Sequence, residues 1–134
     1  MNVETLKTNI EQATRIGLGR FADFTGRSSR PEYWYFMLPV IVILIVANLI
    51  DAILLGGMQI LGLILGLALL VPTLSAGARR LHDTDRSAWW LLVALIPFVG
   101  GLAVIYLCCQ PGTPGENRFG PEPAPASFRA MAQA

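Results

Sequence analysis

The chain has 134 residues, of which 54% are hydrophobic and only 14% are charged, and its formal net charge is +1. The length suits one structural unit, and the charged fraction is well below the roughly 25% that is usual for a soluble domain. The near-neutral charge argues against a nucleic-acid partner.

Residues 1–30 are predicted to form an N-terminal amphipathic helix and a basic hinge. Apolar side chains recur at spacings of three and four over residues 3–18, which indicates a helix with one apolar face. These positions are Val3, Leu6, Ile10, Ala13 and Gly17. The region lacks the apolar core of a cleavable signal peptide. We expect the helix to lie on the membrane surface, against the other helices, or exposed to solvent as a leader.

Residues 31–110 are predicted to form a membrane domain because charge is excluded from long stretches of them. Asp51 is the only charged residue or histidine between Glu32 and Arg79, and there is none between Arg86 and Glu116. A helix in a soluble protein must show a polar face to water, so such stretches favour lipid as the solvent.

The first apolar stretch is too long for one crossing. Residues 36–76 would form a helix of about 60 Å, roughly twice the hydrocarbon thickness, so the chain must fold back. Gly56 and Gly57 mark the turn. Asp51 lies near this turn, and we expect its carboxylate to reach water there rather than to serve in a proton relay.

The uncharged residues 88–109 are predicted to form a third span, because their helical length suits one crossing. The predicted fold is an all-α integral membrane protein with three transmembrane helices in a small bundle. The predicted spans are 34–55, 58–78 and 88–109. An alternative is a third segment that is broken at Pro97 and at Gly100 and Gly101 and returns to its starting face. Residues 111–134 are predicted to form an irregular Pro/Gly-rich tail.

Aromatic and basic residues predict how the chain sits in the membrane. Aromatic side chains with a polar edge prefer the headgroup level, and four residues are expected to act as interface anchors. They are Tyr33, Trp34, Trp89 and Trp90. Most basic residues precede the first span or lie between the second and third spans, which predicts a cytoplasmic N-terminus. Three crossings then place the C-terminus in the periplasm.

A dense polar cluster, residues 79–87, separates the second and third spans. In a continuous helix, Arg79, His82, Asp83 and Arg86 would share one face. The arginines could hold phosphate or anionic headgroups. Alternatively, the cluster has only a structural and topological role, in which cations and acids complement the helix dipoles and the anionic inner leaflet.

A second polar cluster, residues 26–34, is predicted to lie at the same membrane face. Its Glu32 could pair with an arginine of the first cluster, and a headgroup pocket between the clusters is the alternative. The two clusters together give a candidate rim for binding membrane lipid, in particular anionic phospholipid, or a protein partner. The rim residues are Arg27, Arg30, Glu32, Arg79, Arg80, His82, Asp83 and Arg86.

Two further motifs carry structural expectations. Gly62 and Gly66 form a small-xxx-small pattern on the second span, which predicts close helix packing within the bundle or, less favourably, in a homo-oligomer. In the tail, Glu116, Asn117 and Arg118 stand among glycines and prolines, which predicts a defined turn that docks on the membrane rim or the bundle. The sequence contains none of the common nucleotide-binding, hydrolase or metalloprotease motifs, and we expect no cofactor and no metal site.

Three motifs together resemble the domain of unknown function 805 family. They are GRSSRPEYW at 26–34, RRLHDTDRSAWW at 79–90 and PGTPGENRFGPEP at 111–123. The resemblance covers about residues 20–123, with the motifs in the family's order. It implies a small multi-span protein of the bacterial inner membrane and supplies no activity.

The sequence therefore favours a non-enzymatic protein of the inner membrane with a structural or interaction role. One alternative is a subunit of an oligomeric transporter or channel, since three spans with few internal polar groups cannot line a pore alone. The other alternative is an enzyme acting on lipid headgroups, with His82 and Asp83 as an acid–base pair.

Overall fold

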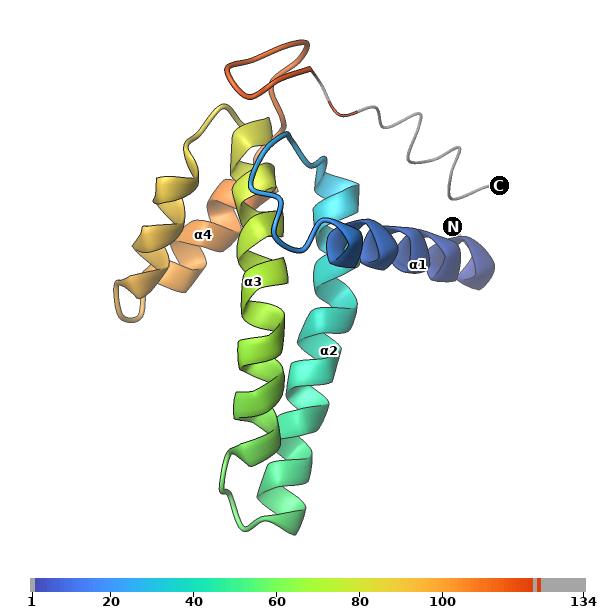
Figure 1. The fold of residues 1–134 in the computed structure, drawn as a ribbon, viewed down its shortest axis with the longest axis vertical. Helices are drawn as coiled ribbons and strands as arrows, with labels where there is room; N and C mark the ends of the chain where they lie inside the picture. The colour runs from blue at the N-terminus through green and yellow to red at the C-terminus, as the bar shows by residue number, and fades with distance from the viewer. Residues whose placement is uncertain (1, 122, 124–134) are drawn as a thin grey trace.

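Two long antiparallel helices form the axis of the molecule (Figure 1). The computed structural model describes residues 2–121 and 123. Helix α2 spans Arg30–Leu54 and packs along α3, which spans Ile60–Asp83. Helix α1, Val3–Gly19, lies across the upper part of this pair.

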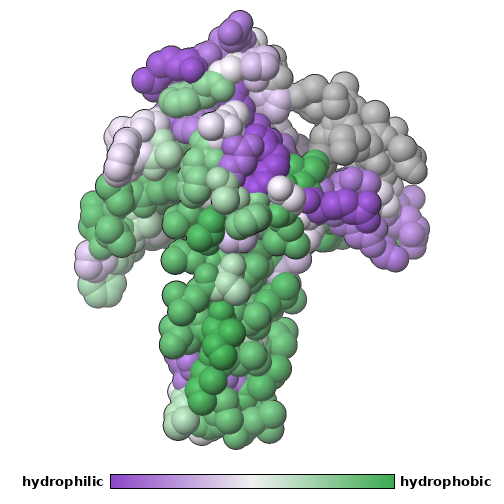
Figure 2. Space-filling model, viewed as in Figure 1, coloured by the Kyte–Doolittle hydropathy of each residue, from purple (hydrophilic) through white to green (hydrophobic). Residues whose placement is uncertain are grey.

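The hairpin of α2 and α3 has the dimensions and surface of a membrane-spanning unit. Among the described residues, these are the two helices long and apolar enough to cross a bilayer. The 25 residues of α2 correspond to about 37 Å, which exceeds the roughly 30 Å hydrocarbon layer. The lower part of the pair presents almost only hydrophobic side chains, whereas polar residues gather at the upper end (Figure 2). The fold-back predicted from the length of the apolar stretch is confirmed.

The turn between α2 and α3 is built around two glycines and one carboxylate. Gly56 and Gly57 have φ angles of 63° and 93°, which L-residues with a side chain rarely adopt. The Asp51 carboxylate accepts hydrogen bonds from Leu61 N at 3.0 Å and Gly62 N at 2.7 Å. Asp51 is 1% exposed, so the expectation that it reaches water is wrong. Its carboxylate instead satisfies amides at the start of α3 that no intrahelical carbonyl can reach.

The small-residue positions of α3 differ in their surroundings. A Cβ on Gly62 would lie 3.1 Å from Asn48 Oδ1 and 3.2 Å from Asp51 Oδ2, so this glycine permits a close approach of α2. A Cβ on Gly66 would meet nothing within 4 Å. Close packing within the chain therefore uses Gly62.

The segment predicted as a third crossing is not one helix. It contains the 3-10 helix η1, Ala88–Leu95, and the short helix α4, Gly100–Cys109, which pack against each other. Pro97 lacks an amide donor, and Phe98 has a φ of 70°. A Cβ on Gly100 would lie 2.2 Å from Val93 O, so the return of the chain requires glycine here. The ten residues of α4 reach only about 15 Å, half of the hydrocarbon thickness.

The apolar core lies where α1 crosses the central pair. Ala13 and Gly17 of α1 face α2, and a Cβ on Gly17 would lie 2.4 Å from the Phe36 ring. Phe36 is buried together with Tyr33 and with Cys108 of α4. The helix predicted over residues 3–18 is therefore present, and its small residues let it sit directly on α2.

Candidate functional site

The polar residues form one assembly, which we call the polar cap: residues 20–32, 79–87 and 110–121. It occupies the upper end of the α2–α3 pair, and the tail loops over it (Figures 1 and 2). The two clusters predicted to share a face do meet there. The tail motif joins them at the same end, whereas three crossings would place it at the opposite one.

A buried carboxylate between two buried arginines is the centre of the polar cap. Asp83 Oδ1 lies 2.9 Å from Arg27 Nη2 and 3.0 Å from Arg27 Nε, and Asp83 Oδ2 lies 2.6 Å from Arg80 Nη1. Arg80 is 0% exposed and Asp83 is 4% exposed. Charges this deep are tolerated only when they are paired and hydrogen-bonded, and charge-assisted hydrogen bonds of this kind are the strongest in proteins.

Backbone carbonyls of the tail satisfy the remaining donors of Arg27. Its Nη1 donates to Gly115 O at 2.6 Å and to Gly120 O at 3.2 Å, and its Nη2 donates to Thr113 O. Thr113 N in turn donates to Asp83 O at 2.6 Å. The guanidinium group therefore ties the tail loop to the end of α3.

Arg80 reaches the start of the tail in the same way. Its Nε donates to Cys108 O at 2.8 Å, and its Nη2 donates to Gln110 O. A Cβ on Gly112 would lie 2.1 Å from Asp83 Oδ2. Glycine is thus required at position 112 for the tail to pass this close to the carboxylate.

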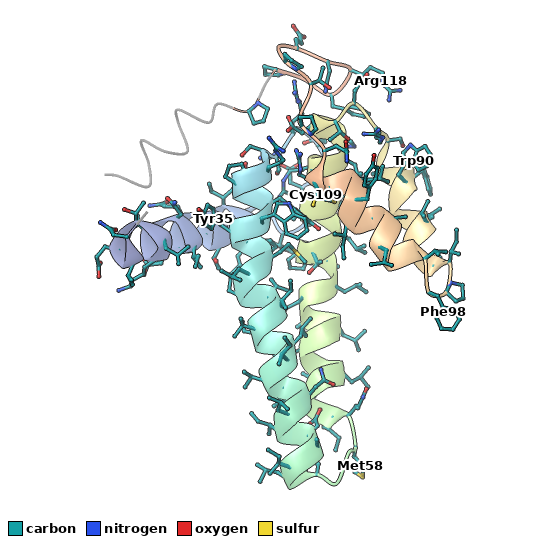
Figure 3. All side chains as sticks on the ribbon, turned by 180° about the vertical axis from the view of Figure 1, so that it is seen from behind. Tyr35, Met58, Trp90, Phe98, Cys109 and Arg118 are labelled. Carbon is teal, nitrogen blue, oxygen red and sulfur yellow. The ribbon has the colours of Figure 1, made fainter. Side chains whose placement is uncertain are left out.

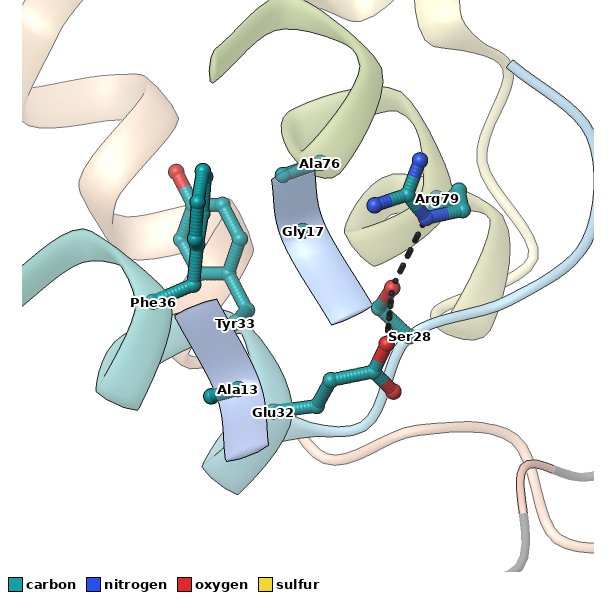
Figure 4. A pocket seen from close by; sticks show the side chains of 8 residues that line it. All are labelled: Ala13, Gly17, Ser28, Glu32, Tyr33, Phe36, Ala76 and Arg79. Atoms are coloured by element: carbon teal, nitrogen blue, oxygen red, sulfur yellow. Dashed lines mark hydrogen bonds between the residues drawn. The ribbon is translucent and has the colours of Figure 1, made fainter. Parts of the chain in front are cut away.

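Arg79 binds the hinge, which is residues 20–29 between α1 and α2, rather than the tail. Its Nη1 donates to Asp23 O at 2.6 Å and to Arg20 O at 3.0 Å. Its Nε donates to Ser28 Oγ at 3.3 Å, and Ser28 Oγ lies 3.4 Å from a Glu32 oxygen (Figure 4). Glu32 therefore meets Arg79 through a serine instead of through the direct ion pair expected. The seam around these groups leaves no room for a water molecule.

His82 belongs to a structural stack. Its Nδ1 lies 3.0 Å from Gly26 O, so this nitrogen carries the proton and Nε2 is the acceptor in the neutral ring. The imidazole stacks on Phe119 with ring centroids 4.0 Å apart and an interplanar angle of 4°. Asn117 Nδ2 donates to His82 O at 2.9 Å. His82 and Asp83 thus have separate partners and form no hydrogen-bonded acid–base pair with each other.

The tail motif forms the tight turn that carries Phe119 to this histidine. Asn117 and Gly120 exchange backbone hydrogen bonds of 3.1 and 3.2 Å. Arg118 lies over the Phe119 ring at 5.0 Å and pairs with Asp85 at 3.2 Å, with both partners substantially exposed. Glu116 is exposed at the surface of the same loop.

The hinge contains one titratable group with a clear perturbation. The Thr25 hydroxyl and amide, and then the Arg20 guanidinium, stabilise the charged form of Asp23 and hold the pKa of this carboxyl well below its ordinary value. Arg20 Nη2 lies 2.8 Å from Asp23 Oδ2. The contacts of Asp23 with Arg20 and Thr25 stabilise the exposed side of the hinge, and Arg79 binds its buried side.

The other predicted rim residues lie at the edge of the polar cap. Arg30 is exposed, and its Nη1 lies 3.4 Å from Cys109 O. Arg86 is half-buried, and its amide donates to Leu81 O at 2.9 Å at the end of α3.

The four expected aromatic anchors differ in their exposure. Tyr33 is buried in the core, Trp34 is half-buried, and Trp89 and Trp90 are exposed on η1. Figure 3 labels Trp90, which lies on η1, and Phe98, which lies between η1 and α4.

The innermost arginines of the polar cap have their partners within the protein. The three innermost arginines are occupied by Asp83, Ser28 and main-chain carbonyls. Within the described part of the chain, no three histidine, cysteine or acidic side chains are grouped to hold a metal ion.

The region that known proteins share with this chain extends from the first to the third segment of the polar cap. The family model "Protein of unknown function (DUF805)" matches residues 21–121. The chain belongs to the DUF805 family. It is 50% identical over 110 residues to the inner membrane protein YhaH of Escherichia coli K12, covering 79% of this chain and 91% of that protein. It is 40% identical over 106 residues to the inner membrane protein YhaI of the same strain, covering 79% and 90%. No solved structure matches the chain.

The family membership gives the protein a location without an activity. The relatives are named as inner membrane proteins, which supports the inner membrane as the location of this chain. The matched segment begins at the hinge and ends with the tail loop. The family region therefore contains all of the polar cap except Arg20.

Some of the residues that build the polar cap were not expected from the sequence. Ser28, Gly112 and Thr113 connect the three segments, yet none was predicted as a site residue. The sequence contained an indication for Gly112, since this residue lies in the Pro-Gly-rich motif predicted to dock. It contained no indication of the carbonyl acceptors, because every residue type has the same backbone oxygen.

Proposed function

We propose that the protein is a non-enzymatic, structural or interaction component of the inner membrane whose polar cap is fixed at the cytoplasmic face. The observation that carries this proposal is the closure of the tail over Arg27, Arg80 and Asp83. A cap whose charged groups are paired with other groups of the same protein is suited to holding the hinge, the end of α3 and the tail in a fixed geometry. The exposed edge of the cap is then the surface that meets lipid headgroups or a protein partner.

The proposed orientation rests on the distribution of charge. All lysines and arginines of the described residues lie in α1 or the polar cap, and the turn between α2 and α3 has none. Basic segments near membrane helices remain cytoplasmic. The turn at Gly56 and Gly57 accordingly faces the periplasm, and both the hinge and the tail loop face the cytoplasm.

The proposed topology has two crossings and one re-entrant arm made of η1 and α4. The arm is apolar on its outside, with Leu95 78% and Phe98 99% exposed, so it needs lipid or protein around it. Its reach of about 15 Å takes it halfway through the hydrocarbon. Its two ends both meet the polar cap, since Arg80 bonds Cys108 O and Ser87 follows the end of α3.

The proposed binding role belongs to the edge of the cap and not to its centre. Arg27, Arg79 and Arg80 are at most 5% exposed, whereas Arg30 is exposed beside the half-buried Trp34. An exposed guanidinium next to an aromatic side chain at the headgroup level suits anionic phospholipid.

A cysteine-accessibility experiment tests this proposal. Single cysteines replace Phe24, Gln59 and Glu116, all exposed, in a Cys108→Ala/Cys109→Ala background. In cells with a permeabilised outer membrane, an impermeant maleimide should label position 59 and spare positions 24 and 116. A permeant maleimide should label all three and serves as the control. Labelling of position 116 with protection of position 24 would restore a third crossing and refute the proposed topology.

A further inference from the structure

An open groove runs down the first turns of α2 from the edge of the polar cap. It is lined by Arg30, Pro31, Trp34, Tyr35 and Leu38 and has a volume of about 530 Å³. Arg30, Trp34 and Leu38 are spaced four residues apart, so they lie one below the other on a single helix face. The distance along the axis from Arg30 to Leu38 is about 12 Å. The groove therefore changes from cationic to apolar along the membrane normal.

The charge at the top of the groove is available to a ligand. Arg27 and Arg80 are buried and occupied by Asp83 and by carbonyls, but Arg30 is exposed. Within the described part of the chain, its side chain makes a long hydrogen bond of 3.4 Å to Cys109 O. No carboxylate of the described residues lies within ion-pair distance of Arg30. Most of the five N–H donors of this guanidinium thus have no acceptor among the described residues.

The walls of the groove are aromatic and pre-ordered. Tyr33, which is buried, holds Trp34 by an edge contact with ring centroids 5.0 Å apart at 77°. Tyr35 lies at the level at which α1 meets α2 (Figure 3). Leu38, 44% exposed, forms the lower end. Aromatic rings at this height match the glycerol and ester region of a bilayer, and leucine matches the acyl chains.

We propose that this groove binds one anionic glycerophospholipid of the inner leaflet. The lipid phosphate pairs with Arg30, its glycerol region lies against Trp34, and one acyl chain follows Leu38. Charge complementarity selects this occupant, because a zwitterionic lipid would bring its own cation beside the guanidinium. The assignment rests on the proposed function, since it requires the polar cap to lie at the headgroups of the inner leaflet.

The test uses Trp34 as the reporter. Trp89→Phe/Trp90→Phe leaves it as the single tryptophan of the chain, which contains three. The full-length protein is reconstituted in bilayers that contain phosphatidylglycerol and phosphatidylcholine, with bromine on the acyl chains of one lipid at a time. Quenching of Trp34 as a function of composition gives the relative affinity of the groove for the two lipids.

We expect the unsubstituted groove to favour phosphatidylglycerol by about five-fold, the effect of one cation near a membrane surface. Arg30→Gln should reduce the preference to about one, and Arg30→Lys should retain most of it. Arg15→Gln, which removes an exposed cation of α1, is the matched control and should retain the preference.

The outcomes separate the groove from the broader proposal. A preference that survives Arg30→Gln would refute this groove and leave an anionic-lipid contact elsewhere on the cap edge. An equal loss in Arg15→Gln and Arg30→Gln would also refute the groove, because the preference would then reflect total charge. If the unsubstituted groove shows no preference for phosphatidylglycerol, both the lipid site in the groove and the lipid contact of the proposed function are refuted. The cysteine experiment would still decide the topology.

Discussion

Asp83→Asn is the substitution that we expect to destabilise the polar cap most. The carboxylate accepts hydrogen bonds of 3.0 Å from Arg27 Nε and 2.6 Å from Arg80 Nη1, and it lies 2.9 Å from Arg27 Nη2. Both arginines are at most 5% exposed. Asparagine keeps the shape but leaves Arg27 and Arg80 buried without a counter-charge. Breaking a buried ion pair on one side costs about 3 to 5 kcal/mol. We expect a loss of stability in this range.

The assay is reversible unfolding in mixed micelles, in which the fraction of SDS is increased and helicity is followed by circular dichroism. Asp85→Asn is the matched control. Asp85 has a φ of 60°, which asparagine also tolerates, and its ion pair with Arg118 is exposed. The control should lose at most about 1 kcal/mol. Equal, small losses in the two variants would refute the argument that Asp83 holds the cap together.

Three further substitutions test separate parts of the structure. Gly112→Ala places a Cβ 2.1 Å from Asp83 Oδ2 and should loosen the tail loop, measured as faster tryptic cleavage of the tail; unchanged cleavage would contradict the close approach. Gly100→Ala should destabilise the arm by about 1 to 3 kcal/mol through overpacking, whereas Gly101→Ala, with nothing within 4 Å, should be neutral; equal effects would argue against the bend. Asp23 has a lowered pKa in the folded state, so its contribution to stability is complete above about pH 4 and is lost as the pH falls further. Asp23→Asn should flatten the dependence of unfolding on pH in that acid range, and an unchanged dependence would show that Asp23 does not contribute.

The membrane hairpin could be predicted because its signals lie in the identity of the residues. A run without charge and two adjacent glycines give two helices and a turn, which the structure confirms. The role of Asp51 was missed because the amides that it binds belong to the start of α3. Its carboxylate satisfies backbone donors that a residue-type pattern does not display.

The third apolar segment could not be assigned in the same way. Residues 88–109 are uncharged whether the segment crosses the membrane or enters it and returns. The deciding feature is the contact of Gly100 with the backbone of Val93, which exists only in the folded chain. Pro97, Gly100 and Gly101 marked the alternative in the sequence, and the bend in the structure follows that alternative.

The sequence predicted the arginine-rich clusters of the polar cap but not the groups that their side chains bind. The two arginine-rich clusters meet as expected, but the arginines bond Asp83, Ser28 and carbonyls of the tail and hinge. An arginine in a sequence suggests a carboxylate or a phosphate as its partner, since main-chain acceptors are invisible there. Whether the edge of the cap binds lipid stays a prediction.

The measurement that tests the account most directly is the distance between spin labels at Phe24→Cys and Glu116→Cys, taken by pulsed electron resonance in bilayers. Phe24 is three residues from Arg27, and Glu116 follows Gly115, whose carbonyl Arg27 binds. Closure of the tail over the polar cap therefore predicts a single distance below about 25 Å, from the reach of these short segments. Labels on opposite faces must be more than about 30 Å apart. A distance in that longer range would contradict the closure of the tail over the polar cap.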